Sequence, residues 1–388
     1  MSFFYWIAGC LLGLAWLSRI VDAAIGMPSV ADISLPQWDL KPVNPPKISI
    51  IVPARNEQAT IEPALYQLLG IDYPNFEIIA IDDRSSDKTG EIMDRVAADP
   101  RSHSILKVVH IEKLPSNWLG KAHAMWTAAR QATGDWLLFT DADVFFKPDS
   151  LRRAISYAQT ESADHVVLFP RMIMKSVGER MMISFFQTMF VFGHRPWKVA
   201  DPKTKDHMGV GAFNLIKRST YEAVGTYEAL RFEVLDDMKL GKVVKASGFA
   251  QRNVFGHDLI SIRWGYGAMG IVNNVTKNFF AVMSFQSWRM LSSSFAVAFL
   301  NLMPFIGIFA ARGWARLPFA IALFCMFAIY VGMSSRSDVR PYYFLLHPVS
   351  TILFVYAMLR SMFLTLGQGG VVWRGTKYPL EELKRGLV

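Results

Sequence analysis

The sequence has little cysteine, and what it lacks excludes several classes of protein. Only two cysteines, Cys10 and Cys325, occur in 388 residues, and both lie inside long apolar runs. Neither has a second Cys or a His at metal-ligand spacing, which excludes a disulfide framework and a zinc site. No glycine-rich turn follows the first predicted strand, and Gly209-Val210-Gly211 lacks both the third glycine and the strand-to-helix context. Hydride transfer with a dinucleotide cofactor is therefore disfavoured.

A nucleic-acid-binding signature is also missing, although the formal net charge is +9. The chain has no basic arm and no RNA-binding motif. Its basic residues instead flank apolar runs, as do Arg312, Arg316, Arg336, Arg340, Arg360, Arg374, Lys377, Lys384 and Arg385. We therefore expect anionic lipid headgroups, and no nucleic acid, as the partner of these charges.

Charge is absent from three long runs, which cover residues 291–311, 317–333 and 342–359. Each approaches the ~20 residues that cross a bilayer as a helix. The run 3–20 carries only Arg19 and is followed by a Pro-containing segment rather than a small-residue cleavage site. The sequence therefore predicts a retained transmembrane anchor within residues 1–25 and about three apolar segments within residues 276–370.

Between these apolar parts lies a polar, periodically patterned region. A Pro-containing linker over residues 26–46 leads into one predicted domain, residues 47–275. Short β-branched or aromatic runs predict strands at 47–52, 76–81, 105–111, 136–140 and 165–169, and helical periodicity predicts helices at 59–69, 89–98, 121–132 and 150–159. This alternation predicts an α/β fold with a mostly parallel sheet, helices on both faces and ligands at the carboxyl ends of its strands.

Two aspartates at the end of the fourth predicted strand form the most informative motif. Asp141 and Asp143 are two residues apart, so both side chains point to one face if the strand continues. Two carboxylates that face each other repel, whereas a divalent cation bridging a diphosphate would bind between them. The Asp-x-Asp pattern alone is also compatible with a turn that starts the next helix at Asp149 and Ser150.

Six segments in order resemble the motifs of a family 2 glycosyltransferase with a GT-A fold, a Rossmann-like nucleotide-sugar-binding domain. They are IVPARNEQATI, AIDDRSSDKT, WLGKAHAMWTA, LLFTDADVFFKPDSL, GVGAFNLIKRSTYEAVG and EVLDDMKLGKVVKASG, and they cover most of residues 47–264. The flanking apolar runs resemble the bacterial branch with hopanoid-associated and carotenoid glycosyltransferases and, more distantly, ceramide glucosyltransferase. The resemblance implies a UDP-sugar donor and a lipid acceptor.

The resemblance also implies which residues line the nucleoside pocket. These are Pro53, Arg55, Glu57 and Asp83, with Asp83 accepting a hydrogen bond from the uracil imide and Glu57 near the ribose. Asp82 is either a partner at the strand end or a second contact. For Glu57 and Asp82, capping of the helix that follows remains an alternative.

The diphosphate is expected to lie between a lysine and a metal ion. Lys121 follows Gly120 at the start of a predicted helix, where a cation and exposed backbone N–H groups can meet a phosphate. The resemblance implies that Asp141 approaches the ribose or the metal and that Asp143 binds Mg²⁺ or Mn²⁺ directly. The metal would neutralise the charge that develops on the departing diphosphate.

Asp236 and Asp237 stand where the family usually has Glu-Asp. An inverting transferase needs one carboxylate to take the proton of the acceptor hydroxyl. The resemblance assigns this role to Asp237, although the exchange of Glu for Asp236 leaves open which of the two serves. A capping pair at the start of a helix over residues 238–246 is the alternative.

The last motif departs most from the family. Members often have Gln or Arg three residues before Arg-Trp, whereas Arg263-Trp264 is preceded by Ile260. This residue is typical of neither chitin nor cellulose synthases. Arg263 can still bind a diphosphate bidentately. Trp264 is either a wall of the acceptor site or an anchor at the membrane interface.

The segment 178–192 is rich in Met and Phe but short for a membrane span. It predicts a helix in the plane of the interface, with core burial as the alternative. A Met-rich surface beside the base would suit a lipid, because methionine adapts to irregular shapes.

The tail, residues 371–388, is basic and aromatic and resembles a short tail of the lipid-acceptor branch; a path back to the active site stays open. Three later spans would place it across the membrane from a cytosolic catalytic domain. One run is therefore a candidate for a re-entrant segment, and His347-Pro348 makes the last run the best one.

These observations predict an integral protein of a bacterial plasma membrane with a cytosolic catalytic domain. We expect it to act in glycolipid biosynthesis, moving a sugar from a UDP-sugar to a lipid hydroxyl with inversion and with Mg²⁺ or Mn²⁺ as cofactor. The alternatives are a polyprenyl-phosphate sugar synthase, a processive polysaccharide synthase and a non-catalytic membrane protein that binds nucleotide sugars.

Overall fold

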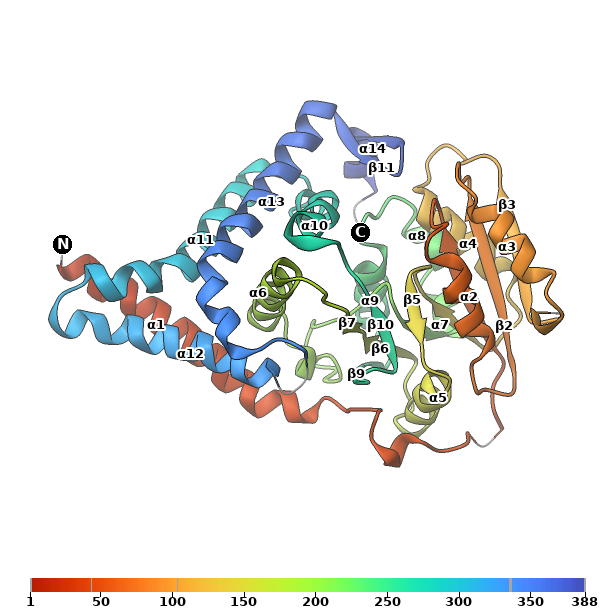
Figure 1. The fold of residues 1–388 in the computed structure, drawn as a ribbon, viewed down its shortest axis with the longest axis horizontal. Coiled ribbons are helices and arrows are strands. Elements are labelled where there is room, and N and C mark those ends of the chain that lie inside the picture. Colours follow the sequence, from red (N-terminus) through yellow and green to blue (C-terminus); the bar gives the residue numbers. More distant parts are fainter. Residues whose placement is uncertain (1, 43, 103, 335–336, 387–388) are drawn as a thin grey trace. The chain divides into compact units, whose positions relative to one another are not determined.

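The computed structural model describes residues 2–42, 44–102, 104–334 and 337–386 (Figure 1). The chain forms two compact units, each assembled from segments distant in sequence. The helical unit comprises residues 1–29, 172–197 and 264–372. The sheet unit comprises residues 30–171, 198–263 and 373–388. The tail therefore belongs to the sheet unit, although the last apolar helix precedes it.

A seven-stranded sheet, in the order β3-β2-β1-β4-β8-β6-β9, forms the centre of the sheet unit. β1 pairs in parallel with β2 and β4, whereas β8 is antiparallel to both of its neighbours. The strands are β1 (Ile48–Ala54), β2 (Phe76–Asp83), β3 (Leu106–Ile111), β4 (Trp136–Phe139), β6 (His165–Phe169), β8 (Asn214–Lys217) and β9 (Gln251–Phe255). The predicted α/β fold with a mostly parallel sheet is confirmed.

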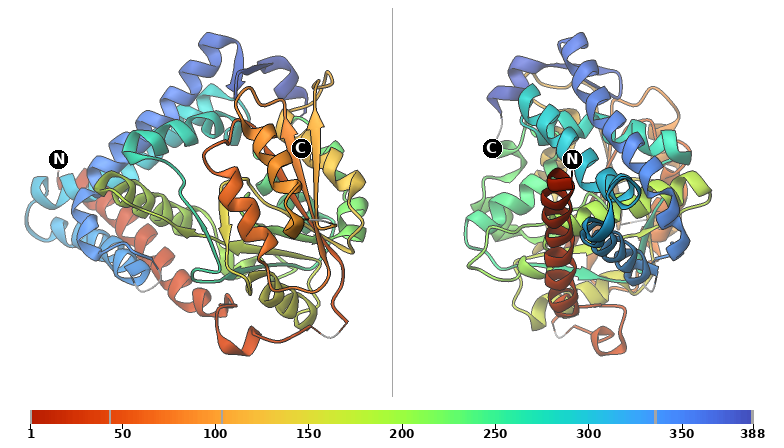
Figure 2. Two further views of the ribbon diagram at one scale, coloured as in Figure 1. Left: turned by 45° about the vertical axis from the view of Figure 1, so that its right-hand side comes forward. Right: turned by 90° about the vertical axis from the view of Figure 1, so that its left-hand side faces the viewer.

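Helices surround this sheet, and those predicted from periodicity begin and end within two residues of the observed bounds. α2 and α3 lie side by side (Figure 2). The helices of the unit are α2 (Ile61–Leu69), α3 (Thr89–Ala97), α4 (Gly120–Gln131), α5 (Ser150–Thr160), α7 (Arg218–Ala223), α8 (Thr226–Ala229), α9 (Asp236–Ala246) and α14 (Leu380–Arg385). A small second sheet has the order β5-β10-β7, with β5 at Val144–Phe146, β10 at Ile260–Ile262 and β7 at Arg171–Met172.

The central strand β1 shows why the sheet forms where the sequence is continuously apolar. Ile48, Ile50, Ile51 and Val52 are fully buried, so both faces of the strand are covered. Strands of parallel sheets that are buried on both faces have apolar runs rather than an alternating pattern. The polar residues after such a strand must then lie at its carboxyl end.

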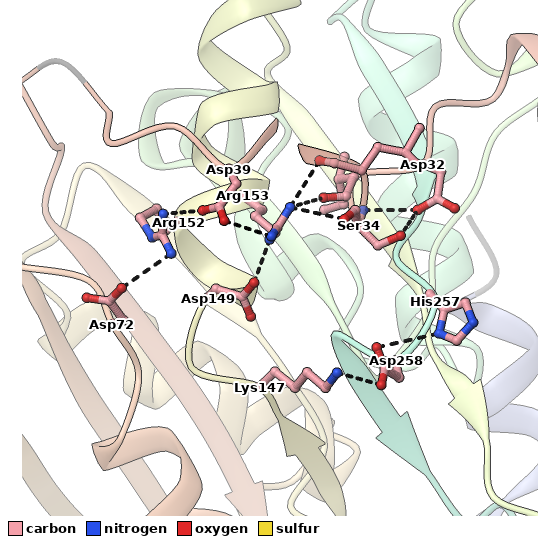
Figure 3. Close-up of polar contacts among 12 residues, drawn as sticks. Asp32, Ser34, Asp39, Asp72, Lys147, Asp149, Arg152, Arg153, His257 and Asp258 are labelled. Atoms are coloured by element: carbon pink, nitrogen blue, oxygen red, sulfur yellow. Dashed lines mark hydrogen bonds and ion pairs between the residues drawn. The ribbon is translucent and has the colours of Figure 1, made fainter. Parts of the chain in front are cut away.

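The segment predicted as a linker packs against α5. The Arg153 guanidinium donates to the carbonyl oxygens of residues 33–35 and pairs with Asp39 and Asp149 (Figure 3). Arg153 is almost fully buried, and its two carboxylate partners balance its charge. This cluster anchors the chain where it enters the sheet unit.

The helical unit contains α1 (Ser2–Gly26), α6 (Val177–Gly193), α10 (Gly267–Val282), α11 (Ser287–Ala310), α12 (Leu317–Ser334) and α13 (His347–Gln368). Among the described residues, four helical stretches are long and apolar enough to cross a membrane: Phe3–Ser29, Ser287–Ala310, Gly313–Ser334 and Pro341–Gln368. The predicted apolar helices at both ends of the chain are therefore present. α6, predicted at 178–192, packs with α10 and α13 through a buried cluster that includes Met181, Met182 and Ile183.

α1 and α12 run in the same direction, and α11 runs against them. Leu12 of α1 packs with Phe319 near the start of α12, whereas Trp16, one turn later, packs with Met326. The Trp16 indole N–H donates to the Leu300 carbonyl in α11 at 3.1 Å. The turn between α11 and α12 therefore lies toward the amino-terminal end of α1.

A neutral polar network joins three helices of the unit. His347 Nδ1 lies 2.9 Å from the Tyr330 hydroxyl, and His347 Nε2 lies 2.9 Å from Asn301 Oδ1. The Asn301 side-chain amide donates to the Val297 carbonyl at 2.8 Å. Each buried polar group has a partner without any ionised side chain, as an apolar environment requires.

Candidate active site

The loops after β1 and β2 hold each other in place. The Asn56 backbone N–H donates to Ser85 Oγ at 3.0 Å, and the Ser86 N–H donates to Asn56 Oδ1 at 2.8 Å. The Glu57 N–H donates to Thr89 Oγ1 at 2.7 Å. Asn56 has a positive φ of 55°, which asparagine tolerates better than most residues. These bonds present the residues at the ends of both strands in one fixed arrangement.

Asp83, the last residue of β2, is only 4% exposed and faces two guanidinium groups. Arg84 donates from Nε to Oδ1 at 2.7 Å and from Nη2 to Oδ2 at 3.1 Å. Arg55 Nη1 lies 4.0 Å from Asp83 Oδ2, and Pro53 is half-buried within β1. The structure thus brings Asp83 and Arg55 together. A nucleobase that donates a hydrogen bond to Asp83 would have to share the carboxylate with Arg84 or displace Arg84.

Asp82 has different partners from Asp83. Its Oδ1 accepts from the Ser85 N–H at 3.2 Å, and its Oδ2 lies 3.2 Å from His110 Nδ1. His110 Nε2 lies 2.9 Å from Asp94, and the hydrogen bond with Asp94, together with Asp82, raises the pKa of His110. Asp82 therefore lies among protein partners at the strand end, one of the two alternatives that the sequence left open.

Lys121 gathers the acidic residues of two distant motifs. Its Nζ lies 2.7 Å from Asp141 Oδ1 and 3.7 Å from Asp236 Oδ1. Burial acts to lower the pKa of Lys121, but the charges of Asp141, Asp236 and Asp237 raise it well above its ordinary value. The lysine is therefore a permanent cation at the start of α4, between the Asp-x-Asp motif and α9.

The segment Gly209-Val210-Gly211 links the same two motifs. The Asp141 N–H donates to the Gly211 carbonyl at 3.0 Å, and the Gly211 N–H donates to Asp237 Oδ2 at 2.8 Å. A Cβ on Gly211 would lie 2.5 Å from Asp141 Oδ2, and one on Gly209 would lie 1.8 Å from the Asp237 carbonyl oxygen. Only glycine fits at position 209, where the clash is with backbone, whereas a side chain at position 211 would require the Asp141 carboxylate to move. Sequence reasoning used these glycines to exclude a dinucleotide and missed this role.

Asp237 contacts backbone N–H groups at the start of α9 and at Gly211. Its Oδ1 accepts from the Met238 N–H at 2.7 Å in the first turn of α9. Burial raises the pKa of Asp237, while Lys121 and the hydrogen bond from Met238 lower it, and the net pKa is raised. A carboxylate with a raised pKa is a stronger base than an ordinary aspartate. Asp237 is thus held in place by backbone donors and remains basic.

Asp143 lies in the field of two other carboxylates. Burial raises the pKa of Asp143 to about 7, with further contributions from Asp141 and Glu57. The raised pKa indicates that nearby positive charge does not compensate the Asp143 carboxylate. A bound cation would supply this compensation. Within the described residues, no group of three or more His, Cys, Asp or Glu side chains could hold a metal by itself. The oxygen donors fit Mg²⁺ or Mn²⁺ if a diphosphate and water complete the coordination.

Arg263 and Trp264 end in different units. β10 pairs antiparallel with β5, with Ile262 opposite Val144. Arg263 directly follows β10, and Asp143 directly precedes β5. Trp264 belongs to the helical unit, where its ring meets Phe186 of α6 edge-on with ring centroids 4.6 Å apart.

Tyr227 is a site residue that sequence reasoning missed. It is fully buried in α8, and its hydroxyl has no hydrogen-bond partner among the described residues. Burial raises the pKa of Tyr227 well above its ordinary value, and the nearby Asp236 adds to this effect. Its sequence context, a tyrosine two residues after Gly225, carries no signal for this position.

The tail also reaches the loops of the site. Arg374 donates to the Glu57 carboxylate and to the Arg55 carbonyl. Thr376 Oγ1 accepts from Arg55 Nη1 at 3.1 Å, and the Tyr378 hydroxyl accepts from the Gly120 N–H at 3.1 Å. Sequence reasoning left this path open but attached no role to these residues.

Comparisons with known proteins agree with the geometry. Residues 49–235 match the family model described as "Glycosyl transferase family 2". The chain is 22% identical over 386 residues to the 4,4'-diaponeurosporenoate glycosyltransferase of Staphylococcus aureus (strain USA300), covering 95% of this chain and 100% of the relative. The protein of the same name from the bovine strain RF122 / ET3-1 is 28% identical over 236 residues, which are 59% of this chain and 60% of the relative.

One solved structure shares the fold over most of the chain. It is the mannosyltransferase PcManGT from Pyrobaculum calidifontis, determined in complex with GDP-Man and Mn²⁺. The TM-score is 0.55 at 18% sequence identity, and the match covers 90% of this chain and 99% of the other.

Proposed function

We propose a reaction for this chain on the premise that it is a membrane-associated glycosyltransferase with a family 2 domain and the GT-A fold. It moves a sugar from a UDP-sugar to a hydroxyl of a lipid-like acceptor, inverts the anomeric centre and depends on a divalent metal. One observation carries the proposal: Lys121 joins the Asp-x-Asp motif to Asp236 and Asp237 at the ends of the strands. This arrangement brings the proposed metal-binding motif and the proposed base together around one lysine.

The donor end of the site is formed by Arg55, Asp83 and Lys121. Asp83 can accept the imide N–H of uracil, and Arg55 beside it can bind the ribose or a phosphate. Lys121 and the start of α4 face the charge of the diphosphate. Guanine also presents N–H donors to a carboxylate, and PcManGT was solved with GDP-Man. The assay below therefore includes GDP-sugars.

Asp141 and Asp143 would hold the metal, which supplies positive charge for the leaving diphosphate when bound. Asp237 takes the proton from the acceptor hydroxyl. The acceptor oxygen forms its bond to the anomeric carbon on the face opposite the diphosphate, and the bond from that carbon to the diphosphate oxygen breaks with its electron pair. The Met238 and Gly211 N–H groups hold the Asp237 carboxylate during this step.

A lipid-like acceptor agrees with the character of the helical unit. Large apolar side chains on its long helices face outward, among them Phe295, Phe309, Phe324 and Phe363. The relatives named above act on diaponeurosporenoate, a carotenoid acid, according to their names. A bilayer would cover such exposed apolar side chains and would deliver a water-insoluble acceptor to the enzyme.

We infer that α1, α11 and α12 cross the membrane and that α13 does not. Residues 373–388 belong to the sheet unit, so the tail and the catalytic domain lie on one side, and an even number of crossings separates them. α12 runs in the direction of α1 and thus returns the chain to the side at which α1 ends. α13 then lies in the interface with α6 and α10, which it contacts. Under this proposal the last apolar run does not cross, and the tail stays on the side of the catalytic domain.

Labelling of single cysteines tests this topology in a Cys10→Ser, Cys325→Ser background. A membrane-impermeant maleimide added to intact cells should label Trp314→Cys, in the exposed turn between α11 and α12. It should label Lys377→Cys in the tail only after lysis. Labelling of both positions from outside would contradict the proposed orientation.

The function itself is tested by mass spectrometry of lipids. The purified chain is incubated with UDP- and GDP-sugars, a bacterial lipid extract and Mn²⁺, and a hexose-sized mass increment on one lipid class is expected. The exposed Glu112→Gln is the control for Asp143→Asn, which should give no product. The absence of any new glycolipid with the unmodified chain and every donor would refute the proposal.

A further inference from the structure

A tight turn at the start of the tail holds Arg374 in an uncommon conformation. Arg374 and Gly375 have φ values of 47° and 78°, as in a type I′ turn, and join β11 (Gly370–Trp373) to β12 (Thr376–Pro379). Glycine adopts this conformation readily, but arginine does so at a cost. The contacts of the Arg374 side chain must offset that cost.

These contacts connect Arg374 to the acidic part of the site. Its guanidinium donates to the Glu57 carboxylate and to the Arg55 carbonyl, both in the loop after β1. Arg55 and Glu57 lie at the carboxyl end of β1, which pairs in parallel with β4, the strand that leads to the Asp-x-Asp motif. Arg374 is therefore held at the strand ends where this motif lies.

Tyr378 makes the second connection, at the start of α4. The residue is 7% exposed, and its hydroxyl accepts from the Gly120 N–H at 3.1 Å. Gly120 begins a 12-residue helix and immediately precedes Lys121. Arg84, the partner of Asp83, lies near the same hydroxyl, since Tyr378 contributes to the raised pKa of Arg84 after the hydrogen bond with Asp83. Tyr378 thus lies between the base-binding and diphosphate-binding parts of the site.

The end of the tail packs on the loop that precedes Asp236. Leu383 of α14 is fully buried, and a Cβ on Gly386 would lie 2.2 Å from the Phe232 side chain. The neighbouring Arg231 carbonyl accepts from the Leu119 N–H at 2.8 Å, which ties this loop to the start of α4. One short segment thus contacts the loops of the donor pocket and the loop that leads to the proposed base.

We propose that Arg374 and Tyr378 of the tail complete the donor site, as positioning residues for the diphosphate of the nucleotide sugar. Arg374 orients Glu57 and adds a second cation opposite Lys121, and Tyr378 fixes the first N–H group of α4. The inference rests on the proposed function, because it takes the nucleotide sugar as the ligand. It adds to that function a part of the chain that follows the last apolar helix.

The test compares two cations of the same tail. Arg374→Ala should raise KM for the UDP-sugar and weaken UDP binding by about tenfold or more, because a charge-assisted hydrogen bond is lost. Arg374→Lys should recover part of this loss. Lys377→Ala removes the same charge from an exposed position on β12 and should leave KM, kcat and UDP affinity unchanged. Tyr378→Phe should raise KM by a few-fold with little change in kcat.

The outcomes separate this inference from the function on which it rests. Equal KM values for Arg374→Ala and Lys377→Ala would overturn the inference. A lower KM in Arg374→Ala would also overturn it, because that result would mean that the tail hinders binding of the donor. If the unmodified chain transfers no sugar, the proposed function fails, and equilibrium dialysis with UDP and Mn²⁺ still tests the tail. A tenfold loss of UDP affinity in Arg374→Ala but not in Lys377→Ala would then support its part in nucleotide binding.

Discussion

The two units bury polar groups in opposite ways. The sheet unit keeps ionised side chains in contact, as with Lys121, Asp141 and Asp236, and burial together with the charges of Asp141 and Glu57 raises the pKa of Asp143 to about 7. The helical unit joins Asn301 to His347 by neutral hydrogen bonds. This difference indicates that catalysis belongs to the sheet unit, because an uncompensated charge is stable only where water, a ligand or a metal can reach it.

One carboxylate of the helical unit fits the same rule. Glu179 is almost fully buried in the first turn of α6, but its oxygens accept from the Lys175 and Gly267 N–H groups at 2.7 and 2.9 Å. Backbone donors at a helix start stabilise such a charge. Glu179 is thereby held as a structural link between α6 and α10, whereas the carboxylates of the sheet unit face one another.

The largest effect is expected when the proposed base of the sheet unit is neutralised. Asp237→Asn keeps the shape of the side chain but cannot take a proton, so the transfer rate should fall by about 10²–10⁴-fold. Asp236→Asn should cost less, and the two rates measured side by side identify the base. A nearly unchanged rate in Asp237→Asn would instead favour an acceptor that is already anionic, such as a polyprenyl phosphate.

The next largest effect is expected at the Asp-x-Asp motif. Asp143→Asn should remove most of the dependence of UDP affinity on Mn²⁺, because the metal loses a charged ligand. Equilibrium dialysis with and without Mn²⁺ measures this, and Glu112→Gln is the control. An unmodified chain whose UDP affinity does not respond to Mn²⁺ or Mg²⁺ would contradict the assignment of a metal.

In the helical unit, loss of a polar group should affect stability and leave catalysis unchanged. Tyr330→Phe removes the hydroxyl that contacts His347, and the free energy of unfolding in detergent should fall by about 1 kcal/mol. Tyr356→Phe makes the same change at an exposed position of α13 and should have no effect. If Tyr330→Phe changed kcat or KM rather than the free energy of unfolding, the assignment of catalysis to the sheet unit alone would be wrong.

The smallest expected effect concerns pH and His110, at the edge of the sheet unit. Its pKa is raised in the folded chain by Asp94 and Asp82. A histidine of this kind contributes stability that is fully present below its unfolded pKa of about 6.5 and is lost as pH rises through its higher folded pKa. His110→Gln should therefore lower the unfolding temperature slightly at pH 5.5 and not at pH 9. His207→Gln is the matched control, and equal shifts in both variants would remove His110 as the cause.

Much of the sheet unit could be predicted because its signals are local. Apolar runs predicted β1, β2, β3, β4 and β6, and the polar residues after them marked the edge where the site lies. β5, β8, β9 and β10 were not predicted. They are three to five residues long, and such short strands depend on pairing with partners distant in sequence. The five strands β1 to β4 and β6 were therefore accessible from the sequence, whereas the antiparallel strand β8, the edge strand β9 and the second sheet were not.

The candidate site divides in the same manner. Spacing singled out Asp141 and Asp143, and the family resemblance and a predicted helix start pointed to Lys121. For Asp236 and Asp237, the sequence left open a capping pair before a helix over residues 238–246. The two glycines at 209 and 211 and the hydroxyl of Tyr227 could not be assigned, because their roles arise from distances across the fold. Asp82 and Asp83 are consecutive in β2, so their side chains point to opposite faces of the sheet and contact different partners. The sequence did not decide which partners each would contact.

The sequence by itself determined a catalytic α/β domain between apolar helices and the order of its motifs, because periodicity and strand ends are local properties of a chain. Tertiary structure alone decided that a lysine from α4 joins two acidic motifs and that the tail returns to the loops after β1 and at α4. Those contacts depend on how the strands are ordered in the sheet and on where the tail packs after α13. Neither of these features is encoded in any short window of residues, since both follow from packing over the whole chain.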